Sequence, residues 1–123
     1  MLCENLYRIV TLIQESNIIR AELEIDSAHE IFKGHFPSMP ILPGVCMVQC
    51  IKELIDLKLS MHTRIEKADM IKFISMLNPL ESNRVHAQVV LKEHSDTRVV
   101  FQSTLKNKKQ ILLKYTGSLL VVK

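Results

Sequence analysis

The residues best suited to chemistry lie between positions 29 and 49, where a histidine stands in a stretch rich in proline and glycine. Pro37, Pro40 and Pro43 hold the chain extended and exclude a helix before Gly44. An apolar segment follows, so His35 would be fixed close to the start of a buried helix. An imidazole exchanges protons near neutral pH, and the free amides at a helix start favour negative charge.

Residues 45–59 form the helix that must position these groups. The segment contains no Gly or Pro and is long for a strand, and it is rich in Leu, Met, Lys and Glu, which are good helix formers. Pro43 and Gly44 supply a plausible start. The first two turns are apolar on nearly every side, so we expect the helix to be buried almost all round.

Alternating apolar and polar residues predict β-strands on both sides of this helix. The clearest strands are expected at residues 18–25, 84–91, 98–105 and 111–122, with further strands at 7–13 and 68–76. Turn-forming clusters separate them. Short strands joined by short turns favour an antiparallel meander. One mostly buried helix among five or six such strands indicates a sheet curled around a central helix.

The bulk properties of the chain fit one domain, residues 1–123, with a single core. No apolar run reaches the roughly 18 residues of a membrane span. The first ten residues include an acidic residue and lack the basic region of a signal peptide. We therefore expect a cytoplasmic protein in which Cys3, Cys46 and Cys50 are free thiols.

The net charge of +3 is unevenly distributed along the sequence. Residues 1–83 carry eight Lys and Arg against eleven Asp and Glu, whereas residues 84–123 carry eight against two. A basic C-terminal part could attract an acidic partner, or it could be a solvated, lysine-rich sheet face. Nucleic acid is disfavoured as a partner, because the basic residues are scattered and few aromatic residues accompany them.

The pattern G-H-F-P-x-x-P-x-x-P-G-V at residues 34–45 resembles the signature of the 3-hydroxyacyl-(acyl carrier protein) dehydratases of fatty acid synthesis. Residues 29–32 are similar to the segment that leads into that signature, and the rest of the chain agrees in pattern. The resemblance implies an α+β hotdog fold, in which an antiparallel sheet wraps around one long helix, about residues 44–59. It also implies a dimer with sheets joined edge to edge and an active site at the subunit interface.

The resemblance further implies which residues act. Dehydration of a 3-hydroxyacyl thioester to a trans-2-enoyl thioester needs a base for the C2 proton, an acid for the leaving C3 hydroxyl and a donor to the thioester oxygen. His35 is expected as the base and the Gly44 N–H as the donor. The substrate-binding residues expected from the motif are Phe36, Pro43 and Val45. Acyl carrier protein would bring the substrate, and neither a cofactor nor a metal is expected.

Position 49 departs from the family pattern. The family has Glu or Asp five residues after the glycine of the motif, and this sequence has Gln49. Glutamine can hydrogen-bond a hydroxyl but cannot deliver a proton, and general acid catalysis typically gives roughly 10²–10⁴-fold. The departure puts turnover in question and leaves the binding geometry intact. Glu53 lies one helical turn further, roughly 5–6 Å away, and would need a shift to take over this role.

Other functions fit the same residues. A thioesterase of the same fold would position a water with Gln49 or His35. A non-catalytic subunit of a heterodimer would combine His35 with the acidic residue of a complete paralogue. Gly44 can also serve only as the helix start, and Gln49 can be a core residue bonded to the backbone. Cys46 and Cys50 resemble half a metal site, but no further motif completes it, so we expect small core residues.

Overall fold

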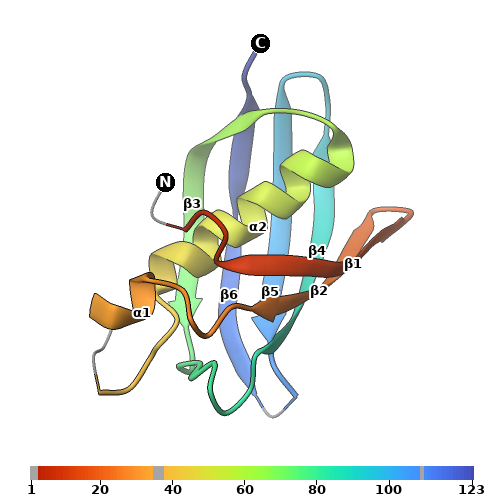
Figure 1. Cartoon of the computed structure of the whole chain (residues 1–123). Coiled ribbons are helices and arrows are strands. Elements are labelled where there is room, and N and C mark those ends of the chain that lie inside the picture. The colour runs from red at the N-terminus through yellow and green to blue at the C-terminus, as the bar shows by residue number, and fades with distance from the viewer. Residues whose placement is uncertain (1–2, 35–37, 109) are drawn as a thin grey trace.

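The computed structural model describes residues 3–34, 38–108 and 110–123. His35 and Phe36, two of the expected site residues, lie outside the described residues. The elements in chain order are β1 (Tyr7–Glu15), β2 (Ile18–Ile25), α1 (Ile31–Gly34), α2 (Gly44–Leu59), β3 (Thr63–Phe73), β4 (Arg84–His94), β5 (Arg98–Lys106) and β6 (Ile111–Val121) (Figure 1). None of the described helices is long and apolar enough to cross a membrane.

The strands form one antiparallel sheet in the order β1-β2-β4-β5-β6-β3. The β4-β5-β6 part is the meander that the turn pattern predicts. After β2 the chain forms the short α1 and then α2, which crosses one face of the sheet and leads to β3 at the far edge (Figure 1). The sheet therefore wraps around the long helix, as expected, with β1 and β3 as its two edges.

The alternation seen in the sequence marks the buried face correctly. In β2, Ile19 and Leu23 are buried while Arg20 between them is exposed, and in β4 Val85 and Val89 are buried around the exposed Gln88. Such alternation arises because successive side chains of a strand point to opposite faces of the sheet. These inward residues form one core with the buried side of α2.

Strand β3 differs from its prediction. The sequence predicts a strand at residues 68–76, whereas β3 begins at Thr63 and ends at Phe73. All of its residues except Thr63 are exposed, because β3 is an edge strand that extends beyond the packed core. Its pairing with β6 is irregular at two places, and a side chain at Gly117 of β6 would lie 2.3 Å from the Lys67 carbonyl oxygen. Glycine is therefore required at position 117 for the irregular β3 to approach β6.

Helix α2 buries one side, not its whole circumference. The buried side chains are Cys46, Met47, Cys50, Ile51, Leu54 and Ile55. Val45 is 63% exposed and Leu57 is 58% exposed, so the expectation of burial almost all round is wrong for the single chain. The reason is that the sheet contacts the helix from one side. The helix ends at Ser60, whose left-handed backbone (φ 52°) returns its N–H to the last carbonyl groups.

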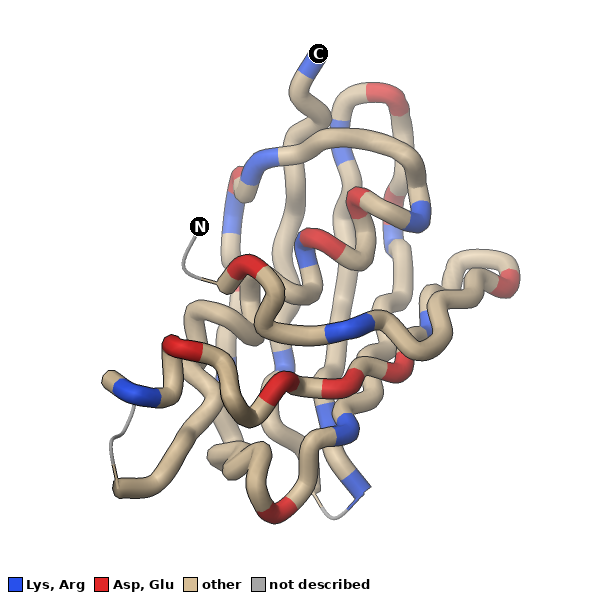
Figure 2. Tube along the Cα trace, in the orientation of Figure 1, with Lys and Arg blue, Asp and Glu red and all other residues tan. Residues whose placement is uncertain are grey.

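Ion pairs join two of the basic residues of positions 84–123 to acidic residues of the first part of the chain. Arg84 contacts Glu22 at 2.6 Å and Glu24 at 3.0 Å, and Arg98 contacts Glu66 at 2.9 Å. The described lysines of residues 84–123 are exposed, and Figure 2 shows basic residues spread over several strands. This arrangement favours the interpretation of a solvated sheet face over that of a concentrated basic patch.

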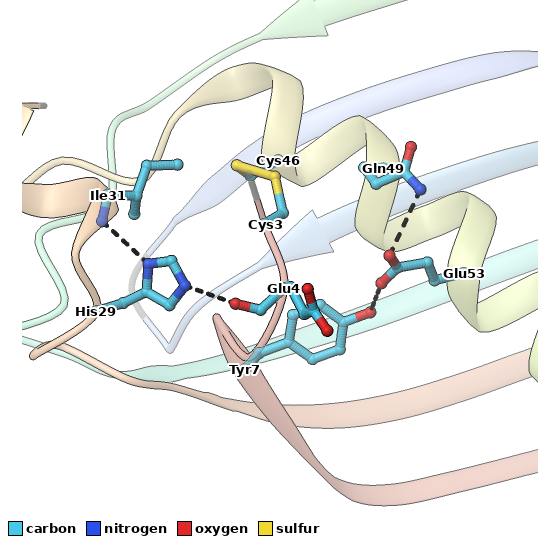
Figure 3. Close-up of a disulfide and its surroundings, with 8 residues drawn as sticks. All are labelled: Cys3, Glu4, Tyr7, His29, Ile31, Cys46, Gln49 and Glu53. Carbon is cyan, nitrogen blue, oxygen red and sulfur yellow. Dashed lines mark hydrogen bonds between the residues drawn. A yellow bond between two sulfur atoms is a disulfide. The ribbon is translucent and has the colours of Figure 1, made fainter. Parts of the chain in front are cut away.

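The cysteines do not behave as the sequence suggested. Cys3 and Cys46 form a disulfide with a Cα–Cα distance of 5.9 Å, and Cys50 is free and buried. The expectation of three free thiols is therefore wrong for two of them. The pairing joins the segment before β1 to the first turn of α2 (Figure 3). The two residues are 43 positions apart in the sequence, so only the folded topology shows that they meet.

Candidate active site

The start of α2 presents backbone donors. Leu42 N–H donates to the Leu77 carbonyl at 2.9 Å, which fixes the proline-rich segment against the loop before β4. The carbonyl of the buried Pro43 accepts the N–H groups of Cys46 and Met47, and Pro43, the N-cap residue, makes no side-chain cap. Within the described residues, the N–H groups of Gly44 and Val45 have no acceptor. Together with the helix dipole, they suit a developing negative charge.

The ring of Phe73, at the end of β3, lies against Gly44. A Cβ at position 44 would fall 2.6 Å from Phe73 Cε1 and 2.8 Å from Cζ. Such distances are far below van der Waals contact, so a side chain at this position would have to displace the ring. Phe73 is 55% exposed, and its ring stands beside the donors at the helix start. Glycine at position 44 thus makes room for a neighbouring side chain that sequence reasoning did not identify.

Gln49 lies one and a half turns further along α2 and is half-buried. Its Nε2 donates to Glu53 Oε1 at 3.4 Å, and the Tyr7 hydroxyl donates to the other oxygen, Glu53 Oε2 (Figure 3). The interpretation of Gln49 as a core residue bonded to the backbone is therefore not what the structure shows. Glu53, which the sequence placed one turn from the expected acid position, has its carboxyl group in contact with the Gln49 amide.

The surroundings of the Glu53 carboxyl group are partly desolvated. Burial, together with the nearby Cys50 and the hydrogen bond to Glu53, raises the pKa of the Tyr7 hydroxyl. Burial, and to a smaller extent the charge of Glu53, raises the pKa of the Cys50 thiol to about 12. At neutral pH Tyr7 is therefore a hydrogen-bond donor and Cys50 a neutral thiol, which excludes Cys50 as a thiolate nucleophile.

Tyr7 is a second residue near the site, after Phe73, that the sequence did not predict. It is the first residue of β1, the expected strand with the weaker pattern, and no motif includes it. Only the folded chain brings this edge strand over the side of α2 that carries Glu53 (Figure 3). A tyrosine near the end of an apolar strand is an ordinary feature, so the sequence offered no usable signal.

The expected site residues fall into three groups. Pro43 and Gly44 form the helix start, with Val45 exposed beside them. Gln49 lies further along the same helix, next to Glu53. His35, expected as the base, and Phe36, expected to bind substrate, lie outside the described residues, so their roles stay predictions.

His29 has a structural role. Its Nδ1 accepts the N–H of Ile31 at 3.0 Å at the start of α1, and its Nε2 contacts the Glu4 carbonyl oxygen at 2.6 Å (Figure 3). The described residues contain no cluster of three His, Cys, Asp or Glu side chains that could hold a metal ion. Cys46 is used in the disulfide, so it does not form half of a metal site with Cys50.

Comparison with known proteins relates the sequence of this chain to dehydratases. Residues 12–114 match the ApeI-like family, described as ApeI dehydratase. Over 52 residues the chain is 36% identical to the 3-hydroxyacyl-[acyl-carrier-protein] dehydratase FabZ of Fusobacterium nucleatum. That match covers 39% of this chain and only 37% of the length of the FabZ protein.

Solved structures show the same fold at low sequence identity. The dehydratase heterocomplex ApeI:P from Xenorhabdus doucetiae contains a chain with a TM-score of 0.73 and 21% identity, covering 92% of this chain and 96% of that one. A thioesterase from Staphylococcus aureus reaches 0.70 at 14% identity, with 99% and 98% coverage. A thioesterase from Pseudomonas aeruginosa reaches 0.68 at 16% identity, with 98% and 85% coverage. These likenesses show that the fold is the hotdog fold.

Proposed function

Because the chain belongs to the ApeI-like dehydratase family, as its match over residues 12–114 shows, we propose that it removes water from 3-hydroxyacyl thioesters carried on acyl carrier protein. The observation that carries this proposal is the start of α2, where the N–H groups of Gly44 and Val45 have no acceptor among the described residues. A thioester carbonyl bound there would gain negative charge in the transition state and be stabilised by donors that are already oriented. The proposed setting is cytoplasmic fatty acid synthesis or a related lipid or polyketide pathway.

The reaction would use His35 as the base for the C2 proton. Removal of this proton places charge on the thioester oxygen, which the Gly44 N–H would stabilise. The C3–O bond then breaks, the departing oxygen takes a proton and leaves as water, and the C2–C3 double bond forms. The pantetheine arm arrives with the substrate. The protein would therefore supply an acid, a base and the backbone N–H dipoles at the start of α2.

The direct test is turnover of a 3-hydroxyacyl group attached to acyl carrier protein. We expect mass spectrometry to show the loss of one water from the carrier-bound group, with the thioester still intact. Release of free thiol without an enoyl product would overturn this assignment in favour of a thioesterase. The thioesterase alternative has support from the fold alone, which this chain shares with thioesterases at 14% and 16% identity.

A second function is favoured by Gln49, which cannot act as an acid. In that case the chain is a subunit of a heterodimer, where His35 would combine with an acidic residue supplied by a paralogue. The fold relative from Xenorhabdus doucetiae is itself part of a dehydratase heterocomplex. Turnover that appears only after a second hotdog chain is added would support this function.

We also propose that the chain assembles into a dimer through β3. This edge strand exposes apolar side chains, among them Ile71 at 40% and Phe73 at 55%. An exposed edge with apolar side chains tends to pair with another strand, and pairing across a two-fold axis would cover both copies. The exposed Val45 of α2 is a further apolar side chain that a partner could cover.

Light scattering should therefore show a dimer at micromolar concentration, and Ile71→Glu should convert it to a monomer. A charge placed in an apolar contact costs several kcal/mol unless it finds a partner, enough to raise the dissociation constant more than a hundredfold. Ile13→Glu on the opposite edge, where Ile13 is 47% exposed, is the matched control and should remain dimeric. A monomeric wild type, or dissociation by Ile13→Glu alone, would show that β3 is not the interface.

A further inference from the structure

Glu53 is a half-buried carboxyl group with both oxygens engaged. Oε1 accepts from the Gln49 amide at 3.4 Å, and Oε2 accepts from the Tyr7 hydroxyl. None of the described Lys or Arg side chains lies within ion-pair distance of it, and its neighbour Lys52 contacts Asp56 at 2.8 Å instead. Among the residues that the structure describes, neutral donors therefore hold this carboxyl group.

The position of the Glu53 carboxyl group, next to Gln49, is the second ground for a role in the reaction. The resemblance to the dehydratases leads us to expect an acid at position 49, where this chain has Gln49. Glu53 is an acidic side chain in direct contact with Gln49 (Figure 3). The 3.4 Å contact is longer than the usual 2.7–3.2 Å of an N–H···O hydrogen bond. Rotation of the Gln49 side chain would bring its amide toward a substrate hydroxyl, while the hydrogen bond from Tyr7 keeps Glu53 in place.

The Gln49 amide can pair with either protonation state of its neighbour. Its NH₂ group donates to a carboxylate, and after rotation its carbonyl oxygen accepts from a carboxylic acid. Tyr7, whose hydroxyl stays protonated, donates to the carboxylate that remains after a proton is given away. Gln49 and Tyr7 therefore fix the position and orientation of the Glu53 carboxyl group.

We propose that Glu53 is the general acid of the dehydration, with Gln49 and Tyr7 as positioning residues; this inference rests on the proposed function. The carboxylic acid of Glu53 gives its proton to the C3 oxygen as the C3–O bond breaks, and water leaves. The electron pair of the broken C2–H bond forms the double bond, and the base holds the C2 proton. Exchange of protons with solvent then restores both groups. Gln49 holds the C3 hydroxyl beside the acid.

The test exchanges the two side chains while keeping their atoms almost unchanged. Wild type, Glu53→Gln, Gln49→Glu and the double variant Gln49→Glu/Glu53→Gln are compared on short- and medium-chain 3-hydroxyacyl-pantetheine thioesters. We expect wild type to turn over and Glu53→Gln to lose roughly 10²–10⁴-fold in kcat. The double variant should regain most of this loss, because a carboxyl group again stands beside an amide. Equal thermal unfolding of all four proteins would show that the fold is intact.

The positioning residues need readouts of their own. Tyr7→Phe should lower kcat and leave KM unchanged. Gln49→Met should lower kcat and also raise KM, because the C3 hydroxyl of the substrate loses a hydrogen-bond partner. Gln49→Glu, which keeps a polar group at position 49, should keep KM near the wild-type value. A residue with a merely structural role would change the unfolding temperature instead.

Three outcomes distinguish a wrong assignment of Glu53 as the acid from a wrong proposal of the dehydratase function. Full kcat in Glu53→Gln would overturn Glu53 as the acid and leave the dehydratase function in place. If wild type is inactive and Gln49→Glu is active, Glu53 is again not the acid, because dehydration would then require a carboxyl group at position 49. No dehydration by wild type, Gln49→Glu or the double variant would overturn both proposals.

Discussion

Replacement of His35 by alanine is expected to lower the rate of dehydration by roughly 10²–10⁴-fold, the effect of losing a general base. The C2 hydrogen of a thioester is a weak acid, and Glu53, the other proton-transfer group proposed for this site, serves the C3 oxygen. The loss should appear in kcat and be the same in wild type and in Gln49→Glu, because position 49 serves the other half of the reaction. Production of enoyl thioester, followed over time, measures it.

His94→Ala is the matched control for this experiment. His94 is an exposed residue at the end of β4, remote in the fold from the start of α2, and its removal should leave kcat unchanged. Retention of full activity by His35→Ala would contradict the proposed base. Equal losses in both variants would point to an effect of histidine removal on folding instead.

Reduction of the Cys3–Cys46 disulfide is expected to lower the free energy of unfolding by about 4 kcal/mol. The bond joins residues 43 positions apart, and closing a loop of this length removes conformational entropy from the unfolded chain by about that amount. For a chain of this size the loss corresponds to a decrease in unfolding temperature on the order of 15 °C. Thermal unfolding with and without a thiol reductant measures it.

Two variants control this measurement. Cys3→Ser removes the bond and should unfold at the lower temperature whether or not reductant is present. Cys50→Ala leaves the bond in place and should still respond to reductant, since Cys50 is a free buried thiol. Identical unfolding of wild type in both conditions would contradict the stabilising role of the bond. In a reducing compartment, such as the cytoplasm expected from the sequence, the protein would have only the lower stability.

Much of the fold could be predicted because the order of apolar and polar residues in a segment depends on which of its side chains are buried. The alternation of Ile19, Arg20 and Ala21 reflects one buried and one solvated face, and the long segment free of Gly and Pro reflects a helix. Strand β3 was misplaced because an edge strand needs no alternation: Arg64 to Phe73 are exposed on both faces. The exposure of Val45 was missed because composition alone cannot tell how much of a helix the sheet will cover.

The site could be predicted only where a continuous motif carried it. The motif at residues 34–45 gave Gly44 and, through its spacing, Gln49. Tyr7 and Phe73 come from strands at the two opposite edges of the sheet, and their contacts with α2 depend on the complete topology. The Cys3–Cys46 disulfide escaped prediction for the same reason.

The ring of Phe73 beside Gly44 has a consequence for how tightly any ligand can bind at the helix start. A ligand atom placed where a Cβ of residue 44 would lie would collide with the ring, so such a ligand binds only conformers in which the ring has turned away. Its apparent dissociation constant is then the intrinsic constant divided by the fraction of molecules with the ring displaced. If one molecule in about ten is open, the apparent affinity falls about tenfold. The rotamer population of Phe73 would thereby contribute to the substrate concentration at which the site is half saturated.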